Sequence, residues 1–503
     1  MIPNHLFLYQ HLERSAADFP DKMAAQDTQT TLSYSALHQS ASAIAHKLVE
    51  NGVKPGDRVI LYLSNSVEFV QAFWGAVYAG AAVTPLSIET KPKKLAWIIS
   101  DCTPAAIIAQ GDQLDVLDVI HDQEINPFVL SMDEKITLDE TADIPCKGKT
   151  IDQDLGCIVY TSGSTGNPKG VMLSHQNLTA ASRSVCTYLG YRNDDTLFVA
   201  VPLTFDYGMH QLTMAALVGA SVIVETNFSS SLYALHRLAT SGATVFPIVP
   251  TMAPLIFSLA DRFDFSSVRL VSSTAAALHT KVIDQLGDVF TSATIFSMYG
   301  LTECHRCTYV PPADLERKKG SVGVAIPNTE MWVTDSNGDI HTSDATGELV
   351  IRGATVMKGY WNNPEKTLQR LKPGRFPGEF VLYTGDLCRI DADGYLYFLS
   401  RSDDVLKIRG EKVAPKEVED VLLSHQAVSE AIVFGKPDAI QGQVVHACIT
   451  LVQGAQISVD ELRNWCQTHL ASISVPKSIV VHEKFMRNAN GKIDRTALID
   501  QQV

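Results

Sequence analysis

Several features that would assign this chain to a specialised class of protein are scarce or missing. Lysine and arginine total 41 against 55 aspartates and glutamates, so the formal net charge is −14, and binding to nucleic acid, which needs a basic surface, is not expected. Residues 1–20 contain no basic segment followed by a long apolar one, so no secretory signal is predicted. The longest apolar stretches, 72–85 and 214–224, are too short and too rich in small residues to cross a bilayer. We therefore expect a cytoplasmic protein with no stable membrane insertion.

The cysteines give little sign of a disulfide framework. There are nine of them, irregularly spaced, which is typical of reduced thiols. Cys304 and Cys307 form a C-x-x-C with His305 between them, and a zinc or redox site is one interpretation of this pattern. No second pair completes a four-ligand set, so a metal site is not favoured there.

The chain also lacks repeats, low-complexity tracts and coiled-coil heptads, and its 503 residues predict two or three globular domains. Residues 12–245 alternate helical and strand patterns, which indicates an α/β fold with largely parallel sheets. After residue 320, short strands separated by Asn-Gly and Asp-Gly turns predict a small antiparallel, barrel-like subdomain, and the last hundred residues predict a compact α+β domain. The expected helices are 36–53, 68–78, 415–424 and 458–470, and the expected strands include 57–63, 155–160, 330–334, 347–352, 396–398, 428–434 and 445–451.

The most informative segment is 160–170, which follows the strand pattern 155–160. Its glycines allow backbone N–H groups to approach an anion, and its hydroxyls and lysine add donors and a positive charge. The segment predicts a binding loop for a nucleotide triphosphate, although its spacing differs from a Walker A motif. A flexible Ser/Gly linker is the alternative, and the Pro-Lys-Gly directly before a second strand pattern argues against it. The loop residues are Thr161, Ser162, Gly163, Ser164, Thr165, Gly166, Lys169 and Gly170.

Four further motifs follow this loop in a fixed order. They are Met-Tyr-Gly-Leu-Thr-Glu at 298–303, Tyr-Thr-Gly-Asp-Leu at 383–387, Arg-Ser-Asp-Asp with Lys-Ile-Arg-Gly at 401–410, and Asn-Gly-Lys-Ile-Asp-Arg at 490–495. With these motifs the chain resembles the adenylate-forming superfamily of acyl-CoA synthetases, peptide-synthetase adenylation domains and luciferases, over essentially its whole length. One departure is the segment 272–278, which has no glycine where many relatives have one or two beside the adenine.

The resemblance implies that a carboxylate first displaces pyrophosphate from ATP, and that a thiol then displaces AMP. Lys492 is expected to bridge the substrate carboxylate and the α-phosphate, Glu303 to hold Mg²⁺, and Thr302 to donate to the α-phosphate. Asp386 is expected to accept from the ribose hydroxyls, with Arg401 supporting that contact.

The resemblance also implies a two-domain arrangement. Residues 1–400 are expected to form the AMP-binding domain and residues 405–503 a small mobile domain, with a hinge at 401–404 that includes Asp403. After adenylation the small domain is expected to swing so that Gly410 lines a tunnel for the thiol. Tyr299 and Ala276 could flank the adenine, or either could belong to the core.

The acid-binding pocket is expected between residues 205 and 307. Asp206 suits a substrate ammonium, which favours an amino acid, although similar segments also occur in acyl-CoA ligases. Met298 opposite Tyr207 would shorten the cavity and favour small substrates. The pocket residues expected from the resemblance are Asp206, Tyr207, His210, Ser273, Met298 and Arg306, together with Pro247, Val271 and Cys307.

The favoured hypothesis is a stand-alone enzyme that loads L-proline onto a peptidyl carrier protein in natural-product biosynthesis. The alternative is an AMP-forming acyl-CoA synthetase for a short- or medium-chain acid. The acceptor is then phosphopantetheine on a separate carrier protein supplied in trans, or CoA. A basic cluster could bind either partner: Arg401, Lys407, Arg409, Lys412 and Lys416. A luciferase-like oxygenase and a non-catalytic relative are further alternatives, but no feature marks an oxygen-handling pocket, and Glu303 and Lys492 are both present.

Overall fold

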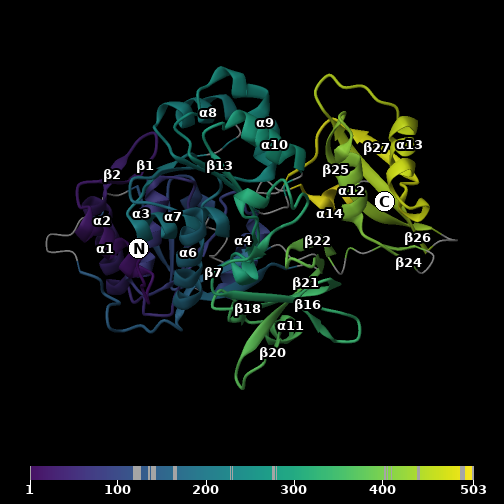
Figure 1. Ribbon diagram of the computed structural model, residues 1–503. Coiled ribbons are helices and arrows are strands. Elements are labelled where there is room, and N and C mark those ends of the chain that lie inside the picture. The colour runs from purple at the N-terminus through teal and green to yellow at the C-terminus, as the bar shows by residue number, and fades with distance from the viewer. Residues whose placement is uncertain are drawn as a thin grey trace.

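The structure is a computed structural model that describes residues 2–116, 126–133, 136, 143–161, 167–226, 228, 230–274, 278, 280–401, 404, 406–408, 411–438, 442–487 and 493–500. Two large sheets and a smaller antiparallel one make up most of the molecule, and the C-terminal elements form a separate group on the right of Figure 1. The mixed α/β fold with a barrel-like subdomain and a small C-terminal domain confirms the predicted fold class.

The first large sheet has seven strands in the order β19-β8-β7-β4-β3-β5-β6. Strands β3 to β7 run parallel, and β8 and β19 are antiparallel additions at one edge. The short apolar runs of β3, β4, β5 and β7 are buried on both faces, as expected for parallel strands covered by helices. The strands are β3 (Arg58–Tyr62), β4 (Ala82–Pro85), β5 (Ala106–Ala109), β6 (Phe128–Ser131), β7 (Leu155–Thr161), β8 (Lys169–Ser174) and β19 (Gly359–Tyr360), and the helices of this region are α2 (Tyr34–Glu50), α3 (Val67–Tyr78), α4 (Pro92–Cys102), α5 (Gln113–Val116) and α6 (His175–Leu189).

The second large sheet has nine strands in the order β15-β14-β13-β12-β11-β9-β10-β1-β2. Its central strands are parallel, and β2, β14 and β15 are antiparallel at the two edges. The strands are β1 (Met23–Gln26), β2 (Thr31–Ser33), β9 (Thr196–Val199), β10 (Ser221–Val224), β11 (Val245–Ile248), β12 (Leu270–Ser273), β13 (Thr294–Tyr299), β14 (Thr308–Tyr309) and β15 (Val324–Ala325), and the helices are α1 (Tyr9–Asp18), α7 (Asp206–Val218), α8 (Ser231–Thr240), α9 (Ala253–Leu259) and α10 (Thr280–Val289).

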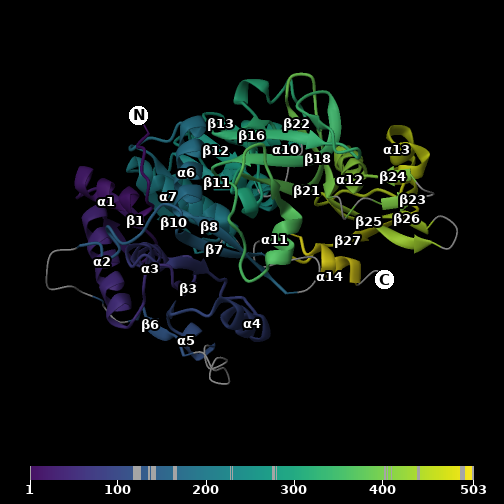
Figure 2. The same cartoon turned by 90° about the horizontal axis from the view of Figure 1, so that it is seen from below.

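The two large sheets share one hydrophobic core, and α6 lies where they meet, beside α7 (Figure 2). Local sequence defines both ends of α6. At its start Ser174 and Asn177 form a capping box, and at its end Gly190 has a left-handed φ of 65°.

The barrel-like subdomain is antiparallel throughout, with β17-β16-β18-β21-β20 in order and β22 paired to β21. It projects below the large sheets in Figure 1. Its elements are β16 (Thr329–Thr334), β17 (Ile340–His341), β18 (Ala345–Gly353), β20 (Leu371–Pro373), β21 (Phe380–Ile390), β22 (Leu396–Arg401) and α11 (Pro364–Arg370).

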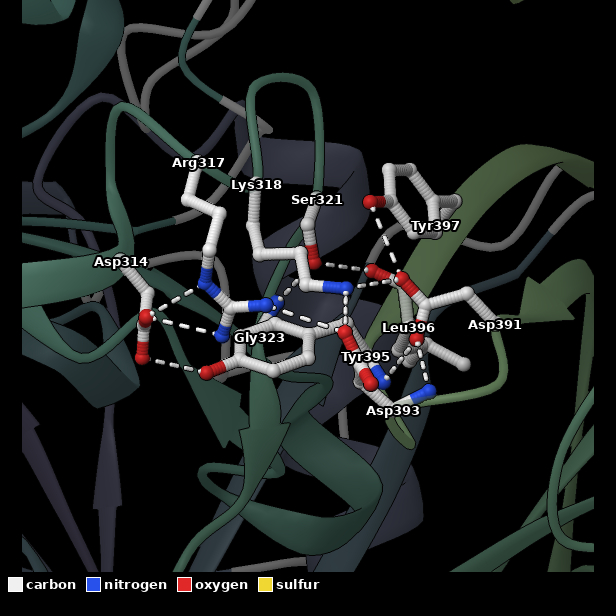
Figure 3. Close-up of polar contacts among 10 residues, drawn as sticks. All are labelled: Asp314, Arg317, Lys318, Ser321, Gly323, Asp391, Asp393, Tyr395, Leu396 and Tyr397. Atoms are coloured by element: carbon white, nitrogen blue, oxygen red, sulfur yellow. Dashed lines mark hydrogen bonds and ion pairs between the residues drawn. The ribbon is translucent and has the colours of Figure 1, made fainter.

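A network of ion pairs joins the turn between β21 and β22 to the loop that precedes β15 (Figure 3). Lys318 donates to Asp391 (2.8 Å) and Asp393 (2.5 Å), and Arg317 contacts Asp393 (3.0 Å). Beside the network, Gly323 and Leu396 form an isolated antiparallel bridge. These contacts attach the subdomain to the edge of the nine-stranded sheet.

The C-terminal region has a hydrophobic core of its own. A three-stranded sheet, β25-β26-β27, packs against α12 and α13. Its elements are β23 (Leu406–Ile408), β24 (Glu411–Val413), α12 (Pro415–Ser424), β25 (Val428–Asp438), β26 (Gly442–Leu451), α13 (Val459–His469), β27 (Ser478–His482) and α14 (Arg495–Asp500). Lys281 of α10 donates to the Ser424 carbonyl (3.0 Å), which links this region to the nine-stranded sheet.

The helix and strand predictions are confirmed, with ends that differ by a few residues. The helix expected at 415–424 has those bounds, and the strand expected at 428–434 extends to Asp438 because it pairs with β26 along its whole length. All nine cysteines are free, buried thiols. In the described part of the chain, no helix has the length and apolar character needed to span a bilayer.

Buried histidines in the core predict acid sensitivity. His11 of α1 is 1% exposed, and its Nδ1 lies 3.1 Å from the Thr213 carbonyl of α7, with His5 and His175 also facing it. Burial, aided by the charge of His5, lowers the pKa of His11 to about 3 from 6.5.

Because the folded pKa of His11 lies below the unfolded one, its contribution to stability is complete above pH 6.5 and is lost as the pH falls toward 3. At pH 5 we expect the low pKa of His11 to make the free energy of unfolding about 2 kcal/mol smaller than at neutral pH. Urea unfolding at pH 7.5, 6 and 5 measures this, and His11→Asn should flatten the pH dependence. An unchanged pH dependence in that variant would contradict the assignment.

Candidate active site

The middle of β21 and the ends of β13 and β22 bring together three residues expected at the nucleoside. Asp386 is 1% exposed and is paired in register with Arg401. Arg401 Nη1 donates to Asp386 Oδ1 (2.5 Å), and the Tyr299 hydroxyl donates to Asp386 Oδ2. Burial, then the charge of Asp386, raises the pKa of Tyr299 well above its usual value, so the phenol remains a donor. Both oxygens of the carboxylate are therefore oriented by neighbours.

The residues expected at the phosphates lie where the two large sheets approach each other. Glu303 lies in a short 3₁₀ turn, Thr302–Cys304, after β13. Its Oε1 accepts from the Tyr360 hydroxyl of β19 (2.7 Å), and its carbonyl accepts from the Met357 N–H (2.9 Å). Lys169 Nζ lies 5.5 Å from the centre of the Tyr360 ring. Thr302, Glu303 and Lys169 are thus brought together across the boundary between the sheets.

This region carries an excess of positive charge. Burial, followed by the charges of Lys366 and Arg370, lowers the pKa of Lys169, while Glu303 acts in the opposite direction. Arg401 adds a further positive charge. Cations held close to one another are destabilising unless an anion neutralises them, so the arrangement suits a polyanionic ligand such as a triphosphate.

A second polar cluster lies between α7 and the segment before β14. Arg306 is 2% exposed, its guanidinium lies 4.7 Å from the Tyr207 ring centre, and its Nη1 lies 4.0 Å from Asp206 Oδ2. The His210 and His305 rings stack with centroids 4.9 Å apart. Burial, then the charge of Arg306, lowers the pKa of His305 to about 3, so this ring is neutral near pH 7.

The remaining expected pocket residues lie on neighbouring strand ends. Ser273 ends β12 and Met298 lies in β13, and both are almost fully buried. The Tyr207 hydroxyl donates to the Ser272 carbonyl (2.8 Å), which joins α7 to β12. The structure therefore brings six of the nine expected pocket residues to one region. Of the other three, Pro247 lies in β11, Val271 lies in β12 and Cys307 directly follows Arg306.

Several expected site residues lie outside the described residues, and their predicted roles stay predictions. Thr161 ends β7 and pairs with Lys169, which places the two ends of the expected phosphate-binding loop side by side. The residues outside the described part are Ser162, Gly163, Ser164, Thr165, Gly166, Ala276, Asp403, Gly410 and Lys492.

Sequence reasoning missed Tyr360, Lys366 and Arg370. Tyr360 follows a glycine that pairs with β8, and α11 begins after the N-cap Asn363 with a proline at its first turn. Lys366 and Arg370 are four residues apart in α11 and share a helix face. The Gly-Tyr-Trp-Asn-Asn-Pro segment could have indicated a strand end followed by a helix, but not its position beside Glu303.

Comparison with known families matches the chain to two models. The AMP-binding enzyme model covers residues 12–361, and the AMP-binding enzyme C-terminal domain model covers residues 417–492. The chain belongs to the AMP-binding enzyme family. This adenylate-forming family comprises AMP-forming acid–thiol ligases and includes both peptide-synthetase adenylation domains and acyl-CoA ligases.

The relatives of this AMP-binding enzyme fall into both groups. Tyrocidine synthase 1 of Brevibacillus parabrevis is 29% identical over 98% of the chain, which spans only 44% of that protein. A 2-succinylbenzoate–CoA ligase of Geobacillus sp. (strain WCH70) is 30% identical, over 95% of the chain and 94% of the relative. The anthranilate CoA ligase AuaEII bound to anthranoyl-AMP (27% identity, TM-score 0.87, covering 99% and 98% of the two chains) and ATP-bound MatB from Rhodopseudomonas palustris (28%, 0.86, 99% of both) have similar structures.

Tyr360 offers a test of how Glu303 is held. Tyr360→Phe removes the hydroxyl that donates to Glu303 Oε1, and we expect kcat for adenylation to fall about tenfold, since one hydrogen bond to a charged group contributes roughly 1.5 kcal/mol. The apparent affinity for magnesium should weaken in the same assay. Tyr397→Phe, which removes a hydroxyl 3.3 Å from Asp391 in the ion-pair network, is the control. Equal rates in the two variants would show that Tyr360 does not orient Glu303.

Proposed function

We propose that this AMP-binding enzyme is an ATP-dependent ligase that joins a small carboxylic acid to the thiol of CoA through an acyl-adenylate. The observation that carries the proposal is the convergence of two carboxylates held by neighbouring side chains, Asp386 and Glu303, around a cluster of cations. A nucleoside triphosphate offers ribose hydroxyls to Asp386, and it offers phosphate oxygens to the cations and to a metal ion held by Glu303.

In the proposed first half-reaction, a carboxylate oxygen of the acid attacks the α-phosphorus of ATP and pyrophosphate leaves. Asp386 accepts from the ribose hydroxyls, and Lys169 and Thr302 bind the phosphates. Lys492 lies between the two reacting anions and reduces their repulsion. In the second half-reaction the thiol attacks the acyl carbon, the thiol proton is released, and AMP leaves.

Glu303 fits a magnesium site. A magnesium ion at a nucleotide is usually bound by one or two carboxylates, with phosphate oxygens and water completing the shell. Glu303 supplies one oriented carboxylate of this kind, and no group of three or more acidic, histidine or cysteine ligands occurs in the described part of the chain. When bound, Mg²⁺ would neutralise phosphate charge in the transition state.

CoA is the preferred acceptor because CoA ligases predominate among the relatives, including an oxalate–CoA ligase of Arabidopsis thaliana. CoA ligases and CoA synthetases also recur among the similar solved structures. Peptide synthetases match over 98–99% of the chain and are the smaller group. The hypothesis of a hinge at Asp403 and a thiol tunnel at Gly410 applies equally to both acceptors.

L-proline loading onto a carrier protein is the second candidate. The similarity to tyrocidine synthase 1 over 98% of the chain supports amino-acid activation in general and does not point to proline. The surroundings of Asp206 weigh against it. Asp206 would have to bind the substrate ammonium, yet the Arg306 guanidinium lies 4.0 Å from it. A buried cation at this distance repels an ammonium and already partly neutralises the carboxylate.

One experiment tests the proposal and separates the candidates. ATP–pyrophosphate exchange is measured with short and medium-chain acids, aromatic acids and proline, and transfer is then measured to CoA and to a phosphopantetheinylated carrier protein. We expect exchange with a small acid and formation of its CoA thioester. Exchange with proline and transfer only to the carrier would favour the second candidate, and no exchange with any acid would refute both.

A further inference from the structure

Arg306 presents a hydrogen-bonding face that nothing in the described protein occupies. Its Nη1 donates to the His305 carbonyl (2.5 Å), but Nε and Nη2 are shielded from solvent and have no partner among the described residues. These two nitrogens form the side-on fork of the guanidinium, whose parallel N–H groups match the two oxygens of a carboxylate. A buried donor without a partner lowers the free energy of unfolding by roughly 1–3 kcal/mol. Two such donors side by side therefore indicate a position where a ligand binds.

The atoms around the fork also lack partners. Both ring nitrogens of His305 and Nδ1 of His210, whose ring stacks on that of His305, are buried without a hydrogen-bond partner in the described structure. A neutral imidazole offers one N–H and one bare nitrogen. Together with the fork of Arg306, these groups supply several donors to one small region. An acceptor-rich group with two oxygens would satisfy more of them than an alkyl chain, which would satisfy none.

Asp206 does not fill this role. Its Oδ2 lies 4.0 Å from Nη1 of Arg306, which is beyond hydrogen-bond distance, and Nη1 is not one of the two fork nitrogens. Its Oδ1 accepts from the Tyr207 N–H (2.9 Å). The carboxylate therefore compensates part of the Arg306 charge and leaves the fork available.

The backbone beside Arg306 is strained. His305 has φ 57° and ψ −71°, which is outside the regions that a residue with a side chain normally occupies. Strain of this kind persists only where the surrounding structure imposes it, and it is concentrated at ligand-binding sites. The next residues hold the segment in place: the Cys307 N–H donates to the Tyr299 carbonyl (3.0 Å), so Arg306 lies between the strand end that carries Tyr299 and the turn that carries Glu303.

We propose that the acid activated by this enzyme carries a second carboxylate, which binds the free Nε–Nη2 fork of Arg306 with His305 and His210 as additional partners. The inference rests on the proposed function, because it places the first carboxylate at the α-phosphate of ATP. It makes Arg306 the residue that selects a dicarboxylic acid over a monocarboxylic acid of the same length.

Matched pairs of acids test the proposal by ATP–pyrophosphate exchange: succinate against butanoate, glutarate against pentanoate, and phthalate against benzoate. In at least one pair we expect kcat/KM for the diacid to exceed that for the monoacid about 30-fold or more, the difference that a charge-assisted bidentate contact supplies. Arg306→Met should lower this ratio to near one. Arg306→Lys, which keeps the charge but loses the fork, should give an intermediate ratio, and the surface variant Arg463→Met should leave the ratio as it is in the parent.

The outcomes are distinguishable. Exchange with monoacids that equals or exceeds exchange with diacids overturns this inference while leaving the proposed function intact. No exchange with any acid overturns the proposed function itself. If Arg306→Met does not fold, the acid pairs measured on the unmodified enzyme still decide the question.

Discussion

Lys492→Ala is expected to reduce ATP–pyrophosphate exchange about 1000-fold, because it removes the cation proposed to lie between two reacting anions. Transfer from a preformed acyl-adenylate to the thiol should change less than about threefold, since Lys492 is proposed to act in the first half-reaction alone. Both rates are measured on the same enzyme preparation. An equal loss of the two half-reactions would contradict the assignment of Lys492 to adenylation.

The described residues on either side of Lys492 provide a second, milder test. The Asp494 N–H donates to the Met486 carbonyl (2.8 Å), and Arg487 and Ile493 form an isolated β-bridge. Arg495 pairs with Glu419, a buried carboxylate on α12 that also accepts from the Val433 N–H. Glu419→Gln weakens this attachment without removing the lysine, so we expect a smaller loss, about tenfold, again confined to adenylation. Rescue by a higher ATP concentration would indicate a binding defect instead of misplacement.

Gly323→Ala is expected to lower the free energy of unfolding by at least about 3 kcal/mol. Gly323 has φ +98°, and a Cβ there would lie 1.9 Å from the Tyr309 carbonyl oxygen. The obstacle is backbone that pairs with β13 and β15, so it cannot move aside without breaking the edge of the nine-stranded sheet. Urea unfolding followed by tryptophan fluorescence, together with the yield of soluble protein, measures the effect.

Gly338→Ala is the control for backbone conformation alone. Gly338 has φ +89°, but a Cβ there meets no atom within 4 Å. We expect Gly338→Ala to lower the free energy of unfolding by about 1 kcal/mol, the usual penalty for a side chain in the left-handed region. If both variants lose the same stability, the close approach of Tyr309 to Gly323 is not what requires glycine.

The secondary structure was largely readable from the sequence, because capping residues and short apolar runs act locally. The helix 415–424 begins with a proline after Ala414, and α6 has both a capping box and a terminal glycine. The alternation of strand and helix predicted parallel sheets correctly. The pairing of strands distant along the chain, such as β1 with β10 and β19 with β8, could not be read in the same way, because it depends on how whole layers pack.

The residues of the candidate site likewise differ in whether the sequence alone could predict them. Thr302, Glu303, Asp386 and Arg401 belong to contiguous motifs whose chemistry is visible in the residues themselves, and the structure places them around one region. Tyr360 was not predicted, because a tyrosine after a glycine carries no sign of which carboxylate it will contact.

By itself, the sequence determined the family and the reaction class, since a glycine- and hydroxyl-rich loop and the motifs after it are complete within short stretches of chain. Only the tertiary structure decided the surroundings of Asp206. The approach of α7 to the segment before β14 places the Arg306 guanidinium against that carboxylate and leaves the fork of Arg306 unpaired. The physical reason is that charge compensation depends on distance in space, and two residues so far apart in the chain acquire that distance only when the layers that carry them have packed.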